Sequence, residues 1–185
     1  MRRFRLPAAV LVFGASFALA TAAFANAPLL SFGTGAVTIT GDSATITLDP
    51  ATEFGGVYSR AQALSNRAIG NLDVSFVSTG DVAGGAPRLN VPIDDDGDHM
   101  WDYWAVIDAA NCGGTSDVPV LVSTSNPDCA VFFLGPGPAA TYASWADYAA
   151  ANPTHRVASK GENSTPFIIA DGTAGTYEIE AIDLQ

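Results

Sequence analysis

Positive charge is scarce in this chain. The 185 residues include eight Lys and Arg against 19 Asp and Glu, which gives a formal net charge of −11. Three of the basic residues, Arg2, Arg3 and Arg5, lie within the first 25 residues. Nucleic acids and anionic membranes bind through cationic patches, so we expect neither as a partner. So acidic a surface instead favours cations and keeps an exported protein soluble.

Long apolar runs are missing beyond the N-terminus. No segment after residue 25 approaches the roughly 18 apolar residues that a membrane span needs. The N-terminus has a basic start, the uncharged run Leu6–Ala20 and small residues at Ala23 and Ala25, which predicts a signal peptide over residues 1–25. An uncleaved anchor is the alternative, but the apolar run is short for it. We expect a secreted or cell-surface protein, with one domain over residues 26–185 and no membrane insertion after cleavage.

Cysteine is limited to Cys112 and Cys129. Outside the cytoplasm such a pair predicts a disulfide, which would close a loop of roughly 18 residues and contribute about 3 kcal/mol. The alternatives are a metal site, which would lack nearby histidines, and a nucleophile, which would lack a nearby base.

Catalytic constellations are also lacking. His99 lies among carboxylates, and a base oriented by a carboxylate is half of a hydrolase triad. The other half would be a nucleophile in a G-x-S-x-G turn, and the sequence has no such turn. The second histidine, His155, is far away in the sequence, so nothing supports a two-histidine metal centre. We therefore expect a protein that is not an enzyme.

The chain does contain many short strand patterns separated by Gly, Pro and Asp. These patterns alternate apolar with polar residues or form short β-branched and aromatic runs. Gly41-Asp42-Ser43 between the first two predicts a hairpin. The fold class expected is all-β, an antiparallel β-sandwich or jelly roll. The expected strands are residues 37–40, 44–48, 72–77, 103–107, 118–122, 131–134, 167–169 and 177–182.

One helix interrupts the strand patterns, over residues 144–151. Ser144 is a suitable N-cap, and Asn152-Pro153 ends the helix. Trp145 and Tyr148 are three residues apart and share a helix face, which we expect to pack on the sandwich rather than to form an exposed ligand platform. A further helical turn within residues 61–68 is a weaker expectation.

The chemically most explicit segment is an aspartate-rich loop. Asp94, Asp96, Asp98 and Asp102 stand at positions 1, 3, 5 and 9 of this loop, a spacing that can wrap oxygen ligands around Ca²⁺. It is not an EF-hand, because position 6 is His99 instead of Gly and position 12 is Ala105 instead of Glu. We predict a structural Ca²⁺ site at these four residues. A solvated acidic turn is the alternative, although it leaves four neighbouring like charges without a counterion.

Three aromatic residues adjoin this loop. Trp101, Tyr103 and Trp104 alternate so that, within a strand, Trp101 and Tyr103 share one face and Trp104 takes the other. An exposed aromatic beside polar groups suits sugar binding, whereas core packing of all three is the alternative. The three residues are candidate ligand-binding residues.

Several motifs carry a resemblance to a known group of proteins. They are Gly84–Asp94 leading into the aspartate loop, Asp108–Gly114, Asn126–Cys129, Trp145–Pro153 and Pro166–Asp171. In this pattern, over about residues 70–182, the chain resembles small secreted proteins of actinobacteria and related bacteria that have no assigned function. The resemblance implies a secreted β-sandwich with an Asp-rich loop and one cysteine pair. The resembling proteins often carry Gly where this chain has His99.

These observations lead to two functional hypotheses. The first is a secreted, Ca²⁺-stabilised binding module, with a glycan or another cell-surface polymer as the partner. The second is a structural subunit of a surface layer or filament that self-associates through an edge strand. The edge would come from the hairpin of residues 37–48 or from the strand of residues 177–184. A hydrolase ranks third, because no acid–base pair can be named.

Overall fold

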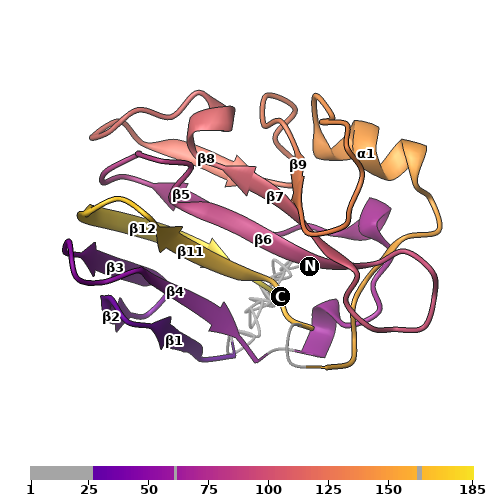
Figure 1. Cartoon of the computed structure of the whole chain (residues 1–185), viewed down its shortest axis with the longest axis horizontal. Coiled ribbons are helices and arrows are strands. Elements are labelled where there is room, and N and C mark those ends of the chain that lie inside the picture. Colours follow the sequence, from indigo (N-terminus) through magenta and orange to yellow (C-terminus); the bar gives the residue numbers. More distant parts are fainter. Residues whose placement is uncertain (1–26, 61, 162–163) are drawn as a thin grey trace, which may run out of the picture.

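The computed structural model describes residues 27–60, 62–161 and 164–185. The predicted signal peptide lies outside these residues. Two antiparallel sheets face each other, which confirms the all-β sandwich (Figure 1). No helix in the described part of the chain is long and apolar enough to cross a membrane.

The larger sheet has seven strands and forms one layer. Six strands follow the order β1-β4-β11-β6-β7-β9, and β10 pairs with β6 where β11 no longer does. All these pairings are antiparallel. The chain repeatedly crosses between the two layers, because the strands of each sheet are not consecutive in the sequence. The strands are β1 (Leu29–Gly33), β4 (Phe54–Ser59), β6 (Arg88–Asp94), β7 (Tyr103–Asp108), β9 (Phe132–Leu134), β10 (Arg156–Val157) and β11 (Phe167–Asp171).

The smaller sheet has five strands in the order β2-β3-β12-β5-β8. The expected hairpin is confirmed, because β2 pairs with β3 across the Gly41-Asp42 turn. The C-terminal strand β12 lies between β3 and β5, so it is not an edge strand, and the edge strands of this sheet are β2 and β8. The strands are β2 (Ala36–Thr40), β3 (Ser43–Leu48), β5 (Ser75–Ser78), β8 (Val120–Ser123) and β12 (Gly175–Asp183).

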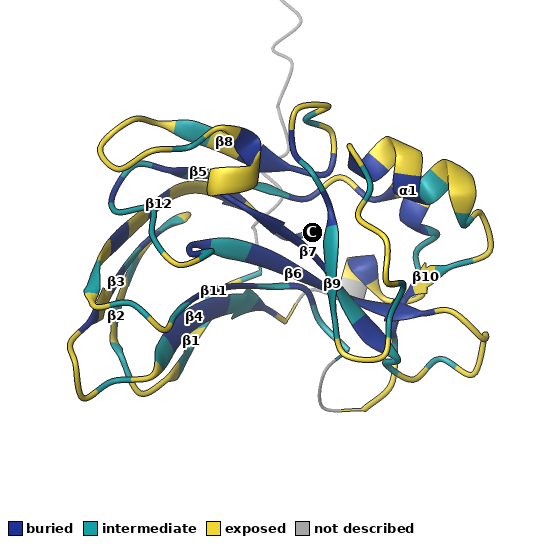
Figure 2. Ribbon diagram, turned by 45° about the horizontal axis from the view of Figure 1, so that its top comes forward, coloured by how far each residue is buried: buried dark blue, intermediate teal, exposed yellow. Residues whose placement is uncertain are grey.

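The hydrophobic core fills the space between the two sheets. Alternate residues of each strand point inward, since successive side chains of a strand face opposite sides. From the larger sheet Val57, Ile168 and Leu89 enter the core, and Ile46 and Tyr177 enter from the smaller one. Figure 2 shows buried residues along the strands of both sheets and exposed residues mainly in the turns.

The short helix α1 (Trp145–Ala151) covers one end of the sandwich (Figure 1). Ser144 caps it as expected, with its side chain accepting a hydrogen bond from the Asp147 N–H. Trp145 and Tyr148 are buried, which confirms that their shared face packs on the sandwich. The indole Nε1 of Trp145 donates to the Ile69 carbonyl at 2.9 Å, so the docked helix leaves this buried donor satisfied.

The remaining helical segments among the described residues are three short 3₁₀ turns. Only one of them, Gln62–Leu64, falls in the region where a helical turn was expected. The other two are Ile69–Asn71 and Ala110–Cys112.

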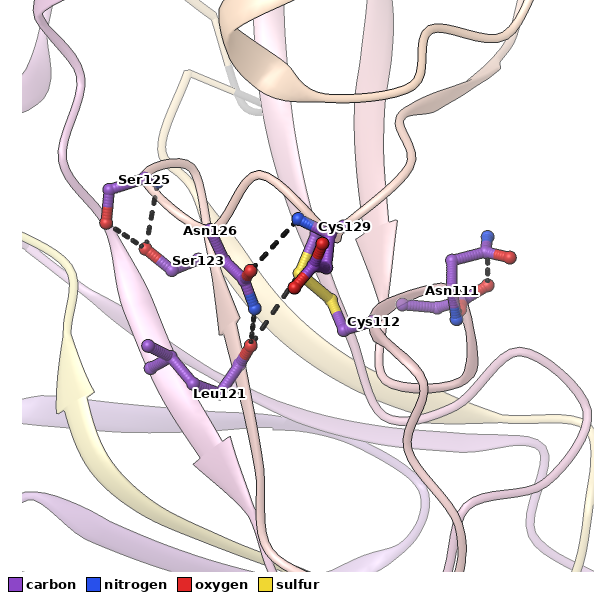
Figure 3. Close-up of a disulfide and its surroundings, with 9 residues drawn as sticks. Asn111, Cys112, Leu121, Ser123, Ser125, Asn126 and Cys129 are labelled. Atoms are coloured by element: carbon purple, nitrogen blue, oxygen red, sulfur yellow. Dashed lines mark hydrogen bonds between the residues drawn. A yellow bond between two sulfur atoms is a disulfide. The ribbon is translucent and has the colours of Figure 1, made fainter.

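The two cysteines form the predicted disulfide. Cys112 ends the 3₁₀ turn, and Cys129 ends the loop that follows β8 (Figure 3). Asn126 organises this loop, because its Nδ2 donates to the Leu121 carbonyl at 2.8 Å and its Oδ1 accepts from the Asp128 N–H at 3.1 Å. The disulfide therefore joins this loop to the segment that follows β7.

Two of the strands that the sequence patterns missed contain residues that usually disfavour strands. In β4, Gly55 and Gly56 hide the strand pattern, yet Gly56 is required there because a Cβ atom would clash with the Ile168 carbonyl and the Phe32 ring. In β6, Pro92 lies between residues 88–90, which pair with β11, and residues 93–94, which pair with β10. Its carbonyl still accepts a hydrogen bond from the Ala158 N–H at 3.0 Å.

Candidate metal centre and its aromatic border

The aspartate loop is the connection between β6 and β7. Ile93 and Tyr103 are paired at the end of the two strands, and the Asp102 N–H donates to the Ile93 carbonyl at 2.8 Å. Asp94 is thus the last residue of β6, and Asp102 immediately precedes β7. The strand pairing holds both ends of the loop in place, which brings these two carboxylates to the same end of the sheet.

Three of the four predicted ligands come together. One oxygen from each of Asp94, Asp96 and Asp102 lies within 4.8 Å of the others. In the described part of the chain this is the only group of three or more His, Cys, Asp or Glu side chains that could hold a metal ion. We call these three residues the Asp triad; Asp94 is buried, Asp102 partly buried and Asp96 exposed.

Backbone N–H groups of the loop hold the carboxylates of the triad in place. Asp94 accepts from Gly97 at 2.7 Å and from His99 at 3.1 Å, one bond to each of its oxygens. Asp102 Oδ2 accepts from the Asp95 N–H at 2.8 Å. The loop is therefore wrapped around Asp94 and fixed at both ends, and each carboxylate retains lone pairs that can face a cation.

Asp98, the fourth predicted ligand, is not part of the Asp triad. Its Oδ1 accepts a hydrogen bond from the Met100 N–H at 2.6 Å, in a local turn on the exposed side of the loop. The two-residue spacing suggested that Asp98 continues the inward alternation of Asp94 and Asp96. That alternation ends at Gly97 and His99, which both have left-handed backbone angles, with φ of 88° and 76°.

His99 adopts a conformation that favours glycine. Non-glycine residues rarely have a positive φ, and histidine is among those that tolerate it best. Its Nδ1 lies 3.9 Å from Asp94 Oδ2, so a protonated His99 would form an ion pair with the buried end of the triad.

The loop also crowds negative charges. Burial raises the pKa of the Asp95 carboxyl, and the neighbouring carboxylate of Asp102 raises it further by repulsion and through a hydrogen bond. A bound cation would relieve this repulsion. The donor set, three carboxylates on one loop, consists of hard oxygens of the kind that Ca²⁺ and Mg²⁺ prefer over soft metals. The Asp triad can therefore hold a metal ion.

The three aromatic residues at the end of the loop and the start of β7 have different environments. Tyr103 is buried in the core, so it presents no exposed ring, and it does not share a face with Trp101, which precedes the strand. Trp101 and Trp104 are partly exposed and pack against each other, with ring centroids 4.4 Å apart. An aromatic pair on either side of Asp102 in the sequence thus lies on the outer side of the larger sheet.

A hydrogen-bonded group beneath the loop was not foreseen. The Tyr103 hydroxyl lies 3.1 Å from that of Tyr148 and 3.0 Å from Nδ1 of His155. His155 thus contacts two tyrosines, and His99 belongs to a different part of the site. Only the position of His155 just after the predicted helix could have suggested this contact.

Comparison of the chain with protein-family models, with curated proteins and with solved structures gives no match. The fold and the site define the class: an all-β sandwich with one disulfide and an acidic hairpin loop able to hold a metal ion. The resemblance to secreted actinobacterial proteins stays a prediction.

Proposed function

We propose that this chain is an exported, non-enzymatic binding module for a glycan or another cell-surface polymer, with a structural Ca²⁺ ion in the aspartate loop. The observation that carries the proposal is the Trp101–Trp104 pair, which is partly exposed and flanks Asp102 of the Asp triad in the sequence. Aromatic rings stack on the apolar faces of sugars, while nearby polar groups bind hydroxyls.

Calcium is proposed over magnesium because of the ligand arrangement. Ca²⁺ accepts irregular sets of six to eight oxygens, whereas Mg²⁺ demands a near-ideal octahedron. The triad supplies three carboxylates of unequal burial, and backbone carbonyls and water would supply the rest. Extracellular sites of this kind bind at roughly 10⁻⁴–10⁻³ M. The ion would hold the loop that ends next to Trp101, and so support the aromatic pair.

Export is supported by two observations. The N-terminal sequence has the pattern of a signal peptide, and the Cys112–Cys129 disulfide is of the kind that persists in oxidising compartments.

The test is retention of the protein on insoluble cellulose, chitin and xylan, with and without EDTA. We expect retention on at least one matrix, loss of retention for Trp104→Ala, and weaker retention in EDTA. Leu121→Ala is the matched control, because Leu121 is exposed on β8 of the other sheet and its removal should change nothing. A wild-type protein that none of these matrices retains would remove the glycan claim.

A second candidate is a self-assembling surface subunit. It is favoured by the free edges of β2 and β8, since β8 also exposes Leu121 and the adjacent turn exposes Val118. Unprotected edges pair with other chains. Light scattering of the purified protein discriminates, because a solution that stays monomeric at high concentration excludes assembly.

A further inference from the structure

The outer face of the larger sheet, which faces away from the core, is aromatic. On β4, Val57 points into the core, so Phe54, Gly56 and Tyr58 point outward. The same alternation directs Phe167 of β11 outward. In antiparallel sheets with one solvated face, outward positions are usually polar, so this composition needs an explanation.

The outward rings form a continuous row. Starting from the aspartate loop, the ring-centroid distances are 4.4 Å from Trp101 to Trp104, 6.0 Å from Trp104 to Phe167, 5.5 Å from Phe167 to Phe32 and 6.2 Å from Phe32 to Phe54. These are the separations of interacting aromatic pairs. We call these five residues the aromatic strip. All five side chains are partly exposed.

The strip is separate from the hydrophobic core. Val106 and Ile169 are buried but do not belong to the core cluster, and both lie on the outward side of their strands. Gly56 has no side chain, and the Phe32 ring lies directly over it. The strip and these small or buried residues thus form a second apolar layer that keeps contact with solvent.

The strip runs diagonally across the sheet. Trp104 pairs with Pro92, Phe167 with both Asn90 and Tyr58, and Phe32 with Gly56, so each step across the strands also moves along them. From β7 to β1 there are four strand-to-strand steps, a width of about 19 Å at the usual strand spacing. A ligand that contacts the whole strip must therefore be elongated.

The polar atoms near the strip suit an uncharged ligand rich in oxygen. The indole Nε1 donors of Trp101 and Trp104 are buried and have no partner in the described part of the chain, and the same holds for Oδ1 of Asn90. Unsatisfied buried donors are rare, and an acceptor oxygen of a ligand would satisfy these two indoles. On the outward face of the sheet, Arg88 and Asp171 neutralise each other in a two-bond ion pair.

We infer that the aromatic strip binds a linear, uncharged polysaccharide laid diagonally across the larger sheet, from the aspartate loop to Phe54. This inference rests on the proposed glycan-binding function and extends its site from two rings to five. A second copy of the chain is the competing occupant. The net charge of −11 disfavours it, because pairing two acidic molecules brings like charges together.

The test measures affinity for soluble fragments, from disaccharide to hexasaccharide, of the matrices that retain the protein among cellulose, chitin and xylan. Affinity should rise with fragment length. Phe32→Leu and Phe54→Leu should weaken hexasaccharide binding roughly two- to tenfold, as expected for one lost aromatic contact, and leave disaccharide binding unchanged. Trp104→Leu should weaken both. Leucine keeps the apolar bulk, Leu121→Ala is the control, and melting curves verify folding.

The possible outcomes distinguish a failure of the five-ring inference from a failure of the proposed glycan-binding function. If the wild type binds fragments but affinity does not depend on length, or Phe32→Leu and Phe54→Leu have no effect, the five-ring strip is overturned and the Trp101–Trp104 site remains. A wild type that no matrix retains overturns the glycan function itself. If Phe32→Leu instead abolishes a dimer in analytical ultracentrifugation, the occupant is a second copy and the polysaccharide is excluded.

Discussion

The hydroxyl of Tyr103 lies 3.1 Å from the hydroxyl of Tyr148, and this contact connects the aspartate loop to the helix. Tyr103 is the first residue of β7, directly after Asp102, and Tyr148 lies on the buried face of α1. His155 Nδ1 approaches both hydroxyls, at 3.0 and 3.2 Å. The helix that covers the end of the sandwich is therefore linked by hydrogen bonds to the residue beside the candidate metal centre.

This pair predicts a loss of stability at alkaline pH. Burial raises the pKa of Tyr103 to about 12, and burial with the Tyr103 hydrogen bond raises the pKa of Tyr148 further above its ordinary value near 10. The folded protein then holds these protons more tightly than the unfolded chain. The contribution of the neutral pair is complete below about pH 10 and is lost as the pH rises through about 12.

Denaturant unfolding at a series of pH values measures this effect. The free energy of unfolding should fall with pH above about 10, and Tyr148→Phe should make that fall shallower because one raised tyrosine is gone. As the pH rises, the tyrosinate absorbance of the folded protein should stay below the value for complete ionisation until unfolding begins, because Tyr103 and Tyr148 keep their protons. An identical pH slope for wild type and Tyr148→Phe would contradict the assignment.

Calcium should stabilise the protein through Asp94, Asp96 and Asp102. At calcium concentrations about tenfold above the dissociation constant, binding adds roughly 1.4 kcal/mol to the free energy of unfolding. Titration calorimetry and melting curves in CaCl₂ should both show this, and Asp94→Asn should abolish it. Asp98→Asn is the matched control, since its amide oxygen can still accept from Met100. Equal losses of calcium binding in the two variants would show that Asp98 is also a ligand. A wild-type protein that gives no heat signal with calcium would show that the loop has no calcium site.

Gly97 should be needed for the shape of the loop. Its φ of 88° is strained for any residue with a Cβ, so we expect Gly97→Ala to reduce stability by about 1–2 kcal/mol and to weaken calcium binding. Gly70→Ala serves as the control, because a Cβ there meets open space and Gly70 has no positive φ. A Gly97→Ala variant with unchanged melting temperature and calcium affinity would show that the loop tolerates another backbone path.

Removing the disulfide should destabilise the domain without changing its fold. Replacing both Cys112 and Cys129 with Ala frees a long loop in the unfolded state, at a loss of about 3 kcal/mol. For a domain of this size the loss corresponds to a melting temperature lower by roughly 6–12 °C. Dithiothreitol should lower the melting temperature of the wild type by a similar amount and leave the double variant unchanged. Sensitivity of the double variant to dithiothreitol would point to another cause.

Local patterns were sufficient for much of the fold. The hairpin β2–β3 was predictable because Val37–Thr40 and Ala44–Leu48 alternate around a Gly-Asp turn, so both faces and the turn agree. The helix α1 was predictable from its Ser144 cap and its Trp145–Tyr148 face. In contrast, β4 and β6 were missed because each contains a residue that usually disfavours strands. Gly56 is explained only by the Phe32 ring that lies over it, and Pro92 only by its position where β6 pairs with neither β11 nor β10.

By itself the sequence determined the composition of the site: four aspartates with alternate spacing, two tryptophans beside them and a cysteine pair able to form a disulfide. The tertiary structure decided which of them act together. The β6–β7 pairing brings Asp94 and Asp102 together, and the left-handed residues Gly97 and His99 leave Asp98 outside. The tertiary structure also placed Tyr103 in the core, and it brought the rings of Phe32, Phe54 and Phe167 into one row with those of the tryptophans. Spacing along one strand fixes only the alternation of faces, whereas neighbours across a sheet depend on strand order and register.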